Sequence, residues 1–199
     1  MTGADAAIVA VDDLEVRYHG GPDPAVRDVS LRLGPGEGLL VAGAAGAGKT
    51  SLLRGLLGLV PRAGQVSLPE RVGYGPQGGG FASGLRVDET ARAVAALRGA
   101  ADPRATAADA LARAGLQYVT RWRTGRLDAE GWRRLSLALA VAGDPPLVVL
   151  DDPWVLSDTL REIARARDRG AAVLAASSRP AGLAPALGGR LDMADGAPR

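Results

Sequence analysis

The residues best suited to chemistry form one short run of small side chains that ends in a lysine and a threonine. In order they are Gly43, Ala44, Ala45, Gly46, Ala47, Gly48, Lys49 and Thr50. This order matches the phosphate-loop pattern, which is a glycine, four free positions and then Gly-Lys-Thr. Glycines let consecutive backbone N–H groups turn toward a polyphosphate, and a helix after the loop adds the positive end of its dipole. The run therefore predicts a nucleotide site.

Two side chains of the run have separate tasks in such a loop. Lys49 would reach the β- and γ-phosphates, and the Thr50 hydroxyl would ligate Mg²⁺. Lys49 is also the only lysine in a chain with 24 basic residues, so the one compact ammonium stands where a phosphate loop needs it. Ser51, which follows in the predicted helix, is included in the expected binding set.

The surrounding sequence supplies the strand and the helix that the loop needs. Residues 38–42 are an apolar run typical of a strand buried on both faces, and residues 51–59 read as a helix that ends before Pro61. The alternating stretches 8–18 and 26–33 predict two half-buried strands before the loop. Further strands are expected at 64–68, 71–77, 147–150 and, as the last core strand, 171–176. Helices are expected at 87–97, 103–115, 130–142 and 158–169.

These elements predict one α/β domain. A chain of 199 residues with 47% apolar residues can bury a full core. We expect a P-loop NTPase core with a RecA-like sheet and an N-terminal antiparallel β part, built from residues 1–77 and 144–199. The helical residues 78–143 are expected to form an insertion in that core.

Composition excludes several other classes of protein. The chain has no cysteine, which excludes a disulfide framework and a zinc–thiolate site. It has neither a signal peptide nor an apolar run of about 20 residues, so we expect a cytoplasmic chain that reaches a membrane only through a partner. Acidic residues are interspersed with the arginines, so the net charge of +2 does not argue for direct nucleic-acid binding. The arginine cluster within residues 121–134 is interpreted as a solvated face.

The order of these parts resembles the ATP-binding subunit of an ABC transporter over nearly the whole chain. The resemblance implies that the cofactors are ATP and Mg²⁺ and that Tyr18 stacks on the adenine. It implies that Gln77, after Tyr74-Gly-Pro, contacts Mg²⁺ and couples to a membrane subunit. It also implies that Asp151, at the end of the strand that begins at Leu147, holds Mg²⁺ through water, and that Asp158 contacts a second subunit. Each match is weak alone, but their order is specific.

Two catalytic positions depart from the family pattern. Asp152 stands where the family has its catalytic glutamate, and its carboxylate is one methylene shorter; a misplacement of about 1 Å can cost roughly 100-fold in rate. Ser178 stands where the family has its switch histidine, and the only histidine, His19, is interpreted as a surface turn residue. We expect Asp152, Gln77 and Ser178 to form a weakened catalytic group.

The family's signature loop departs most. The pattern Leu-Ser-Gly-Gly-Gln, whose N–H groups bind the γ-phosphate held by a partner subunit, appears here as Leu127, Asp128, Ala129, Glu130 and Gly131. Carboxylates at a helix start cap N–H groups and complement the dipole, so the segment should begin a helix well. It should bind anions poorly, because two unit charges about 4 Å apart repel by roughly 1 kcal/mol in water and about 4 kcal/mol at an effective dielectric near 20.

The expected function is therefore that of an ABC transporter ATP-binding subunit with weak hydrolysis of its own. We expect a heterodimer with a second ABC ATP-binding subunit, docked on membrane-spanning subunits through the region after Gln77. The alternatives are a soluble ABC-type ATPase acting on nucleic acid or ribosomes, a regulatory pseudo-ATPase, and an unrelated phosphate-loop kinase or GTPase. Soluble ABC-type ATPases usually carry a coiled-coil insertion or two tandem cores, and neither is present. A guanine-reading Asn-Lys-x-Asp motif is impossible because the single lysine lies in the loop.

Overall fold

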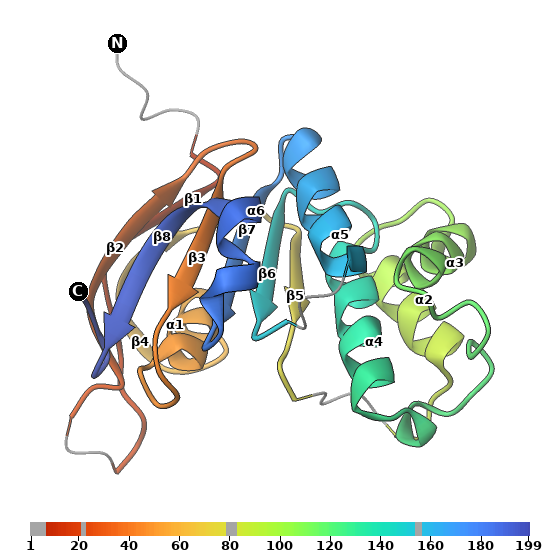
Figure 1. Ribbon diagram of the computed structural model, residues 1–199, viewed down its shortest axis with the longest axis horizontal. Helices are drawn as coiled ribbons and strands as arrows, with labels where there is room; N and C mark the ends of the chain where they lie inside the picture. The colour runs from red at the N-terminus through yellow and green to blue at the C-terminus, as the bar shows by residue number, and fades with distance from the viewer. Residues whose placement is uncertain (1–6, 21–22, 79–82, 154–156) are drawn as a thin grey trace.

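A mixed sheet of six strands forms the centre of the molecule, which is described here from a computed structural model at residues 7–20, 23–78, 83–153 and 157–199 (Figure 1). Five neighbouring strands run parallel, and a two-residue antiparallel strand closes one edge. In spatial order they are β5 (Val72–Gly75), β6 (Leu147–Asp151), β7 (Ala172–Ser177), β3 (Gly38–Ala42), β8 (Gly188–Ala194) and β9 (Ala197–Pro198). Every residue of β6 and β7 is buried, as expected for parallel strands covered on both faces.

A second, antiparallel sheet lies beside the first and corresponds to the predicted N-terminal β part. Its spatial order is β2 (Val26–Leu33), β1 (Val9–Val16) and β4 (Arg62–Ser67). The period-two alternation of β1 is interrupted by a bulge between Val11 and Leu14, where Asp13 has a φ of 51° and donates its N–H to Ser30. Helix α1 (Lys49–Leu56) packs its leucines between the two sheets.

Two helices and part of a third, α4, cover the opposite face of the parallel sheet, and the other side of α4 packs with two more helices in a cluster beyond the β5 edge (Figure 1). The covering helices are α5 (Ser157–Asp168) and the short α6 (Ala184–Leu187). The cluster consists of α2 (Val87–Leu97), α3 (Pro103–Arg113), the 3₁₀ turn Thr124–Arg126 and α4 (Ala129–Val141). These elements lie between β5 and β6 in sequence, where the insertion is expected; its bounds at 78 and 143 stay a prediction. Among the described residues, none of the helices is both long and apolar enough to cross a bilayer.

Local signals explain how these helices begin and end. The side chain of Asp102 accepts the N–H groups of Arg104 and Ala105 at 2.9 and 3.0 Å, so α3 has the predicted N-cap followed by a first-turn proline. At the other end of the cluster, Arg98 donates to the carbonyls of Leu139 and Ala142 that end α4. Burial lowers the pKa of Arg98 to about 10. These hydrogen bonds join the end of α2 to the end of α4 within the insertion.

Two sequence-based expectations need correction. Residues 171–176 are not the last core strand, because β8 follows and pairs in parallel with β3. The sequence of β8 hides it because it begins with two glycines and alternates charged with apolar residues, and only Met193 of the strand is buried. The helix expected at 51–59 begins at Lys49, directly after Gly48 at φ 93°, and ends before Gly58 at φ 69°.

Helix α4 lies so close to β5 that only glycine fits at the contact. A Cβ on Gly73 would overlap the carbonyl oxygen of Ala140 and lie 2.8 Å from the ring of Pro145. Pro76 is the first residue after β5, and its carbonyl accepts a hydrogen bond from the Ser136 hydroxyl of α4 at 2.8 Å. The segment that carries Gln77 is therefore fixed to α4 at two points.

We predict that Gly73→Ala destabilises the protein by about 1–3 kcal/mol, since the added methyl forces α4 away from β5. Gly78→Ala is the matched control, because a Cβ there meets nothing within 4 Å. Urea unfolding monitored by circular dichroism measures both. Equal stability of the two variants would contradict the close packing of α4 on β5.

Candidate functional site

The loop between β3 and α1 has the backbone shape of a phosphate cradle. Gly46 and Gly48 both adopt positive φ, at 83° and 93°, and a Cβ on Gly48 would lie 2.6 Å from the carbonyl of Ala25. The Lys49 ammonium donates to the carbonyls of Gly43 and Ala44 at 2.8 and 2.7 Å. The lysine is therefore held at the loop, where a polyphosphate could exchange for these carbonyls.

Thr50, in the first turn of α1, and Asp151, at the end of β6, place a hydroxyl and a carboxylate next to each other. The Thr50 hydroxyl donates to Asp151 Oδ1 at 3.0 Å, across 101 residues of sequence. Burial raises the pKa of Asp151, and the hydrogen bond from Thr50 opposes that rise. Hydroxyl and carboxylate oxygens are ligands that Mg²⁺ prefers, and Mg²⁺ commonly binds through one or two protein groups together with phosphates and water. The hydroxyl and the carboxylate therefore fit Mg²⁺ bound together with a nucleotide.

The three residues expected to form the catalytic group do come together. The amide of Gln77 donates to Asp152 Oδ2 at 3.0 Å, and the backbone N–H of Ser178 donates to Oδ1 at 3.3 Å. It is the hydroxyl of Ser177, not that of Ser178, that also donates to Oδ1, at 3.3 Å. Both oxygens of Asp152 are therefore engaged, and its backbone has a φ of 47°, in the left-handed region that aspartate tolerates better than most residues.

Two further residues lie near the phosphate loop: Tyr18, which the sequence predicted, and Asp195, which it did not. Tyr18 is 37% exposed, and its hydroxyl donates to Ser51 at 3.3 Å, so the ring stands beside the first turn of α1. His19 is exposed, as expected of a turn residue. Asp195, at the tip of the β8–β9 hairpin, lines the same cleft as Lys49 and Thr50. Without β8 in the predicted fold, nothing in the sequence placed Asp195 near the phosphate loop.

The segment expected to be the signature loop begins α4. Asp128 caps the helix, accepting the N–H of Gly131 at 2.8 Å, as its carboxylate predicts. Glu130 forms an ion pair with Arg134 at 2.8 Å, one turn further along α4, so its carboxylate points away from the start of the helix. Leu127 is half-buried against the helical cluster, and Ala129 is exposed. Of the two carboxylates predicted to repel a phosphate, Asp128 is the one without a cationic partner among the described ion pairs.

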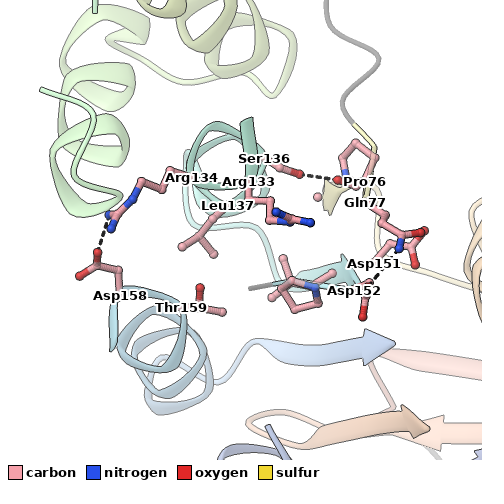
Figure 2. A pocket seen from close by; sticks show the side chains of 13 residues that line it. Pro76, Gln77, Arg133, Arg134, Ser136, Leu137, Asp151, Asp152, Asp158 and Thr159 are labelled. Carbon is pink, nitrogen blue, oxygen red and sulfur yellow. Dashed lines mark hydrogen bonds and ion pairs between the residues drawn. The ribbon is translucent and has the colours of Figure 1, made fainter. Parts of the chain in front are cut away.

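Asp158, expected to contact a second subunit, forms ion pairs inside the chain. Its carboxylate meets Arg134 at 2.7 Å and also meets Arg161, and these contacts, first that with Arg161, lower its pKa. Figure 2 shows Arg134 reaching from α4 to Asp158 on α5. The pocket drawn there lies between α4, α5 and the ends of β5 and β6, and Arg133 extends into it from α4. The sequence identified Arg134 only as part of an arginine cluster.

Comparison with other proteins gives a consistent picture. A family model described as ABC transporter matches residues 26–155. The cytochrome c biogenesis ATP-binding export protein of Roseobacter denitrificans is 40% identical over 152 residues, which cover 75% of this chain and 71% of that protein. The zinc import ATP-binding protein of the same organism is 36% identical over 154 residues, covering 73% and 56%. An uncharacterized ABC transporter ATP-binding protein of Mycobacterium tuberculosis is 34% identical over 158 residues, covering 75% and 22%. The chain thus spans about half of the second relative and less of the third.

Solved structures confirm the predicted fold class. An ATP-binding subunit of an ABC transporter superposes with a TM-score of 0.86 at 18% identity, covering 96% of this chain and 88% of the other. A dimeric ATP-binding cassette in a post-hydrolysis state with ADP and phosphate superposes with a TM-score of 0.85 at 20% identity, covering 96% of each chain. At these identities the likeness establishes the α/β P-loop NTPase fold.

We predict that Asp128→Ala costs about 1 kcal/mol of stability because α4 loses its N-cap, whereas Asp128→Ser retains most of that energy with its hydroxyl. Chemical denaturation of the two variants and the unaltered chain measures the difference. A loss as large for the serine variant as for the alanine variant would show that the cap is not what Asp128 contributes.

Proposed function

This chain belongs to the ABC transporter family, and from that premise we propose that it is the ATP-binding subunit of a membrane transporter. The proposal depends above all on one observation: the phosphate loop and the buried Asp151 are joined by the Thr50 hydrogen bond at one edge of the parallel sheet. In open α/β sheets, ligands bind at the carboxyl ends of the strands. Under this proposal the chain lies at the cytoplasmic face of the membrane, held there by partner subunits.

We propose Mg-ATP as the nucleotide. Lys49 and the N–H groups of the phosphate loop would hold the phosphates, and Tyr18 would lie against the adenine. Thr50, Asp151 and Gln77 would supply the protein oxygens for Mg²⁺, and the bound ion would neutralise phosphate charge. Asp195, in the same cleft, adds a negative charge that favours the sugar or base over a phosphate as its neighbour.

We propose further that hydrolysis by this chain is weak. A general base must accept a proton from the attacking water, yet both oxygens of Asp152 accept hydrogen bonds from Gln77, Ser177 and the Ser178 backbone. Ser178 brings no imidazole to the γ-phosphate. The residues expected to bind the nucleotide are therefore all present, whereas the glutamate and the histidine expected for the chemical step are replaced by Asp152 and Ser178.

Lys49→Ala should weaken ATP binding roughly 100-fold or more, because a charge-assisted contact of about 3 kcal/mol is lost. Equilibrium binding of a fluorescent ATP analogue measures this, with Arg104→Ala on the exposed surface of α3 as the control. If the lysine variant keeps the affinity of the unaltered chain, the phosphate-loop assignment is wrong.

We propose that the transporter contains a second, different ABC subunit. In a head-to-tail pair each phosphate loop faces the α4 start of the other subunit, so two copies of this chain would set Asp128 against both γ-phosphates. One N–H at that helix start is already bonded to the Asp128 carboxylate, which weakens it further as an anion site. A partner with an intact catalytic group would supply the chemistry that this chain lacks.

In the reconstituted complex, removal of the phosphate-loop lysine from the partner should stop transport, whereas Lys49→Ala should leave a substantial part of it. Transport into vesicles measures both variants in parallel. The reverse order of sensitivity, or a native complex with two copies of this chain and no other ATPase, contradicts the heterodimer.

A further inference from the structure

The tight turn between β8 and β9 forms one wall of the proposed nucleotide cleft. It consists of Asp195 and Gly196, whose φ angles of 51° and 79° are both positive, as a two-residue type I′ hairpin turn requires. The backbone N–H of Gly196 donates to the carbonyl of Ala47 in the phosphate loop at 3.3 Å. The carbonyl of Gly196 accepts the N–H of Arg27, in β2, at 2.8 Å. Backbone hydrogen bonds therefore join the turn to the phosphate loop on one side and to β2 on the other.

Close packing also fixes this turn. A Cβ on Gly196 would lie 2.8 Å from the carbonyl oxygen of Ala25. A Cβ on Gly43, at the start of the phosphate loop, would lie 2.4 Å from the carbonyl oxygen of Met193 in β8. The hairpin and the loop thus meet backbone to backbone, without a layer of side chains between them. The fold therefore determines where the backbone of Asp195 lies relative to the phosphate loop.

The side chain of Asp195 is exposed and has no hydrogen bond or ion pair with any residue that the structure describes. The other acidic residue of the hairpin differs, because Asp192 forms an ion pair with Arg190 at 2.6 Å. Asp195 instead lines the cleft between the turn and residues 48–51. Its carboxylate is therefore available to a ligand in that cleft.

This carboxylate lies between the expected positions of the phosphates and of the base. Under the proposed function, residues 46–49 hold the phosphates, and Tyr18, whose hydroxyl donates to Ser51, lies against the adenine. The ribose of a nucleotide joins its base to its phosphates. The cleft that Asp195 lines extends from the phosphate loop to Ser51, so the ribose would lie within it.

The chemistry of a carboxylate fits that position. An ionised carboxylate only accepts hydrogen bonds, and it repels phosphate oxygens. The 2′- and 3′-hydroxyls of ribose are neighbouring donors, and the two oxygens of one carboxylate can accept both. In Rossmann-type folds an acidic residue accepts a hydrogen bond from the ribose of NAD in a similar way.

We infer that Asp195 recognises the sugar of the nucleotide: its carboxylate accepts hydrogen bonds from the ribose hydroxyls and favours ribonucleotides over nucleotides that lack these hydroxyls. The inference rests on the proposed function and adds the sugar specificity of the same site. The turn by itself does not account for the charge, because Asn-Gly suits a type I′ turn as well as Asp-Gly does.

The test compares the binding of ATP and of 2′,3′-dideoxy-ATP in the presence of Mg²⁺, measured by isothermal titration calorimetry. The unaltered chain should bind ATP roughly tenfold more tightly, because the carboxylate forms charge-assisted hydrogen bonds with the hydroxyls. Asp195→Gly tolerates the positive φ and removes the carboxylate, so it should weaken ATP alone and bring the two affinities within about twofold. Asp195→Asn, which keeps the turn and one neutral acceptor, should give an intermediate ratio.

Asp192→Asn is the matched control, because it removes a negative charge from the same hairpin outside the cleft. Asp192 lines a neighbouring hollow beside residues 43–47, which Asp195 also borders. The control should keep the preference for ATP. If it loses the preference as Asp195→Gly does, the charge of the hairpin acts through that hollow and the inference is wrong. Circular dichroism of each variant shows that it is folded.

The outcomes separate this inference from the function on which it rests. If the unaltered chain binds ATP and the dideoxy nucleotide equally, or if Asp195→Gly retains the preference, the inference is wrong and the proposed function stands. If Asp195→Gly changes both affinities by the same factor, the carboxylate acts on the phosphates or on the loop, and the inference is again wrong. If the unaltered chain binds neither nucleotide, both proposals fail.

Discussion

The hydrogen bond between Thr50 and Asp151 is the contact on which the rest of the site depends. It joins the first turn of α1, the helix that follows β3, to the end of β6. Strand β7 lies between β3 and β6 and pairs with both. The bond therefore requires all three strands in register, so that their carboxyl ends lie together. At these ends lie the phosphate loop after β3, Asp151 and Asp152 after β6, and Ser177 and Ser178 after β7. Burial disfavours the charged form of Asp151 and raises its pKa. A cation bound beside the carboxylate would stabilise the charged form.

Helix α4 connects these strand ends to the outside of the molecule. It packs on β5 at Gly73, holds Pro76 through Ser136 and reaches α5 through the ion pair of Arg134 with Asp158. Its start is capped by Asp128, which accepts the N–H of Gly131. Helix α4 thus connects the carboxyl ends of the parallel strands to α5 and to the helical cluster.

The sequence was most informative where one physical rule governs a continuous stretch. The phosphate loop, the buried runs of β3, β6 and β7, and the Asp102 cap of α3 each follow from local geometry, and the structure has all of them. It was least informative where distant segments meet. The hairpin that places Asp195 near Lys49, the hydroxyl of Ser177 on Asp152, and the pairing of Asp158 within the chain depend on tertiary contacts that no local pattern encodes. The bulge at Asp13 was missed although the residues contain its signal, because the apolar positions of β1 change from 9 and 11 to 14 and 16.

The central claim is that this chain binds ATP with a complete set of residues and hydrolyses it with an incomplete one. The most direct measurement is the identity of the bound nucleotide. The purified chain is mixed with Mg-ATP, passed through a desalting column, quenched in acid and analysed for ATP and ADP. An enzyme with a median turnover of about 10 per second would convert all bound ATP before the protein leaves the column. The account predicts that the nucleotide recovered is mainly ATP, in near-equal ratio to protein; recovery of ADP, or of no nucleotide, would contradict it.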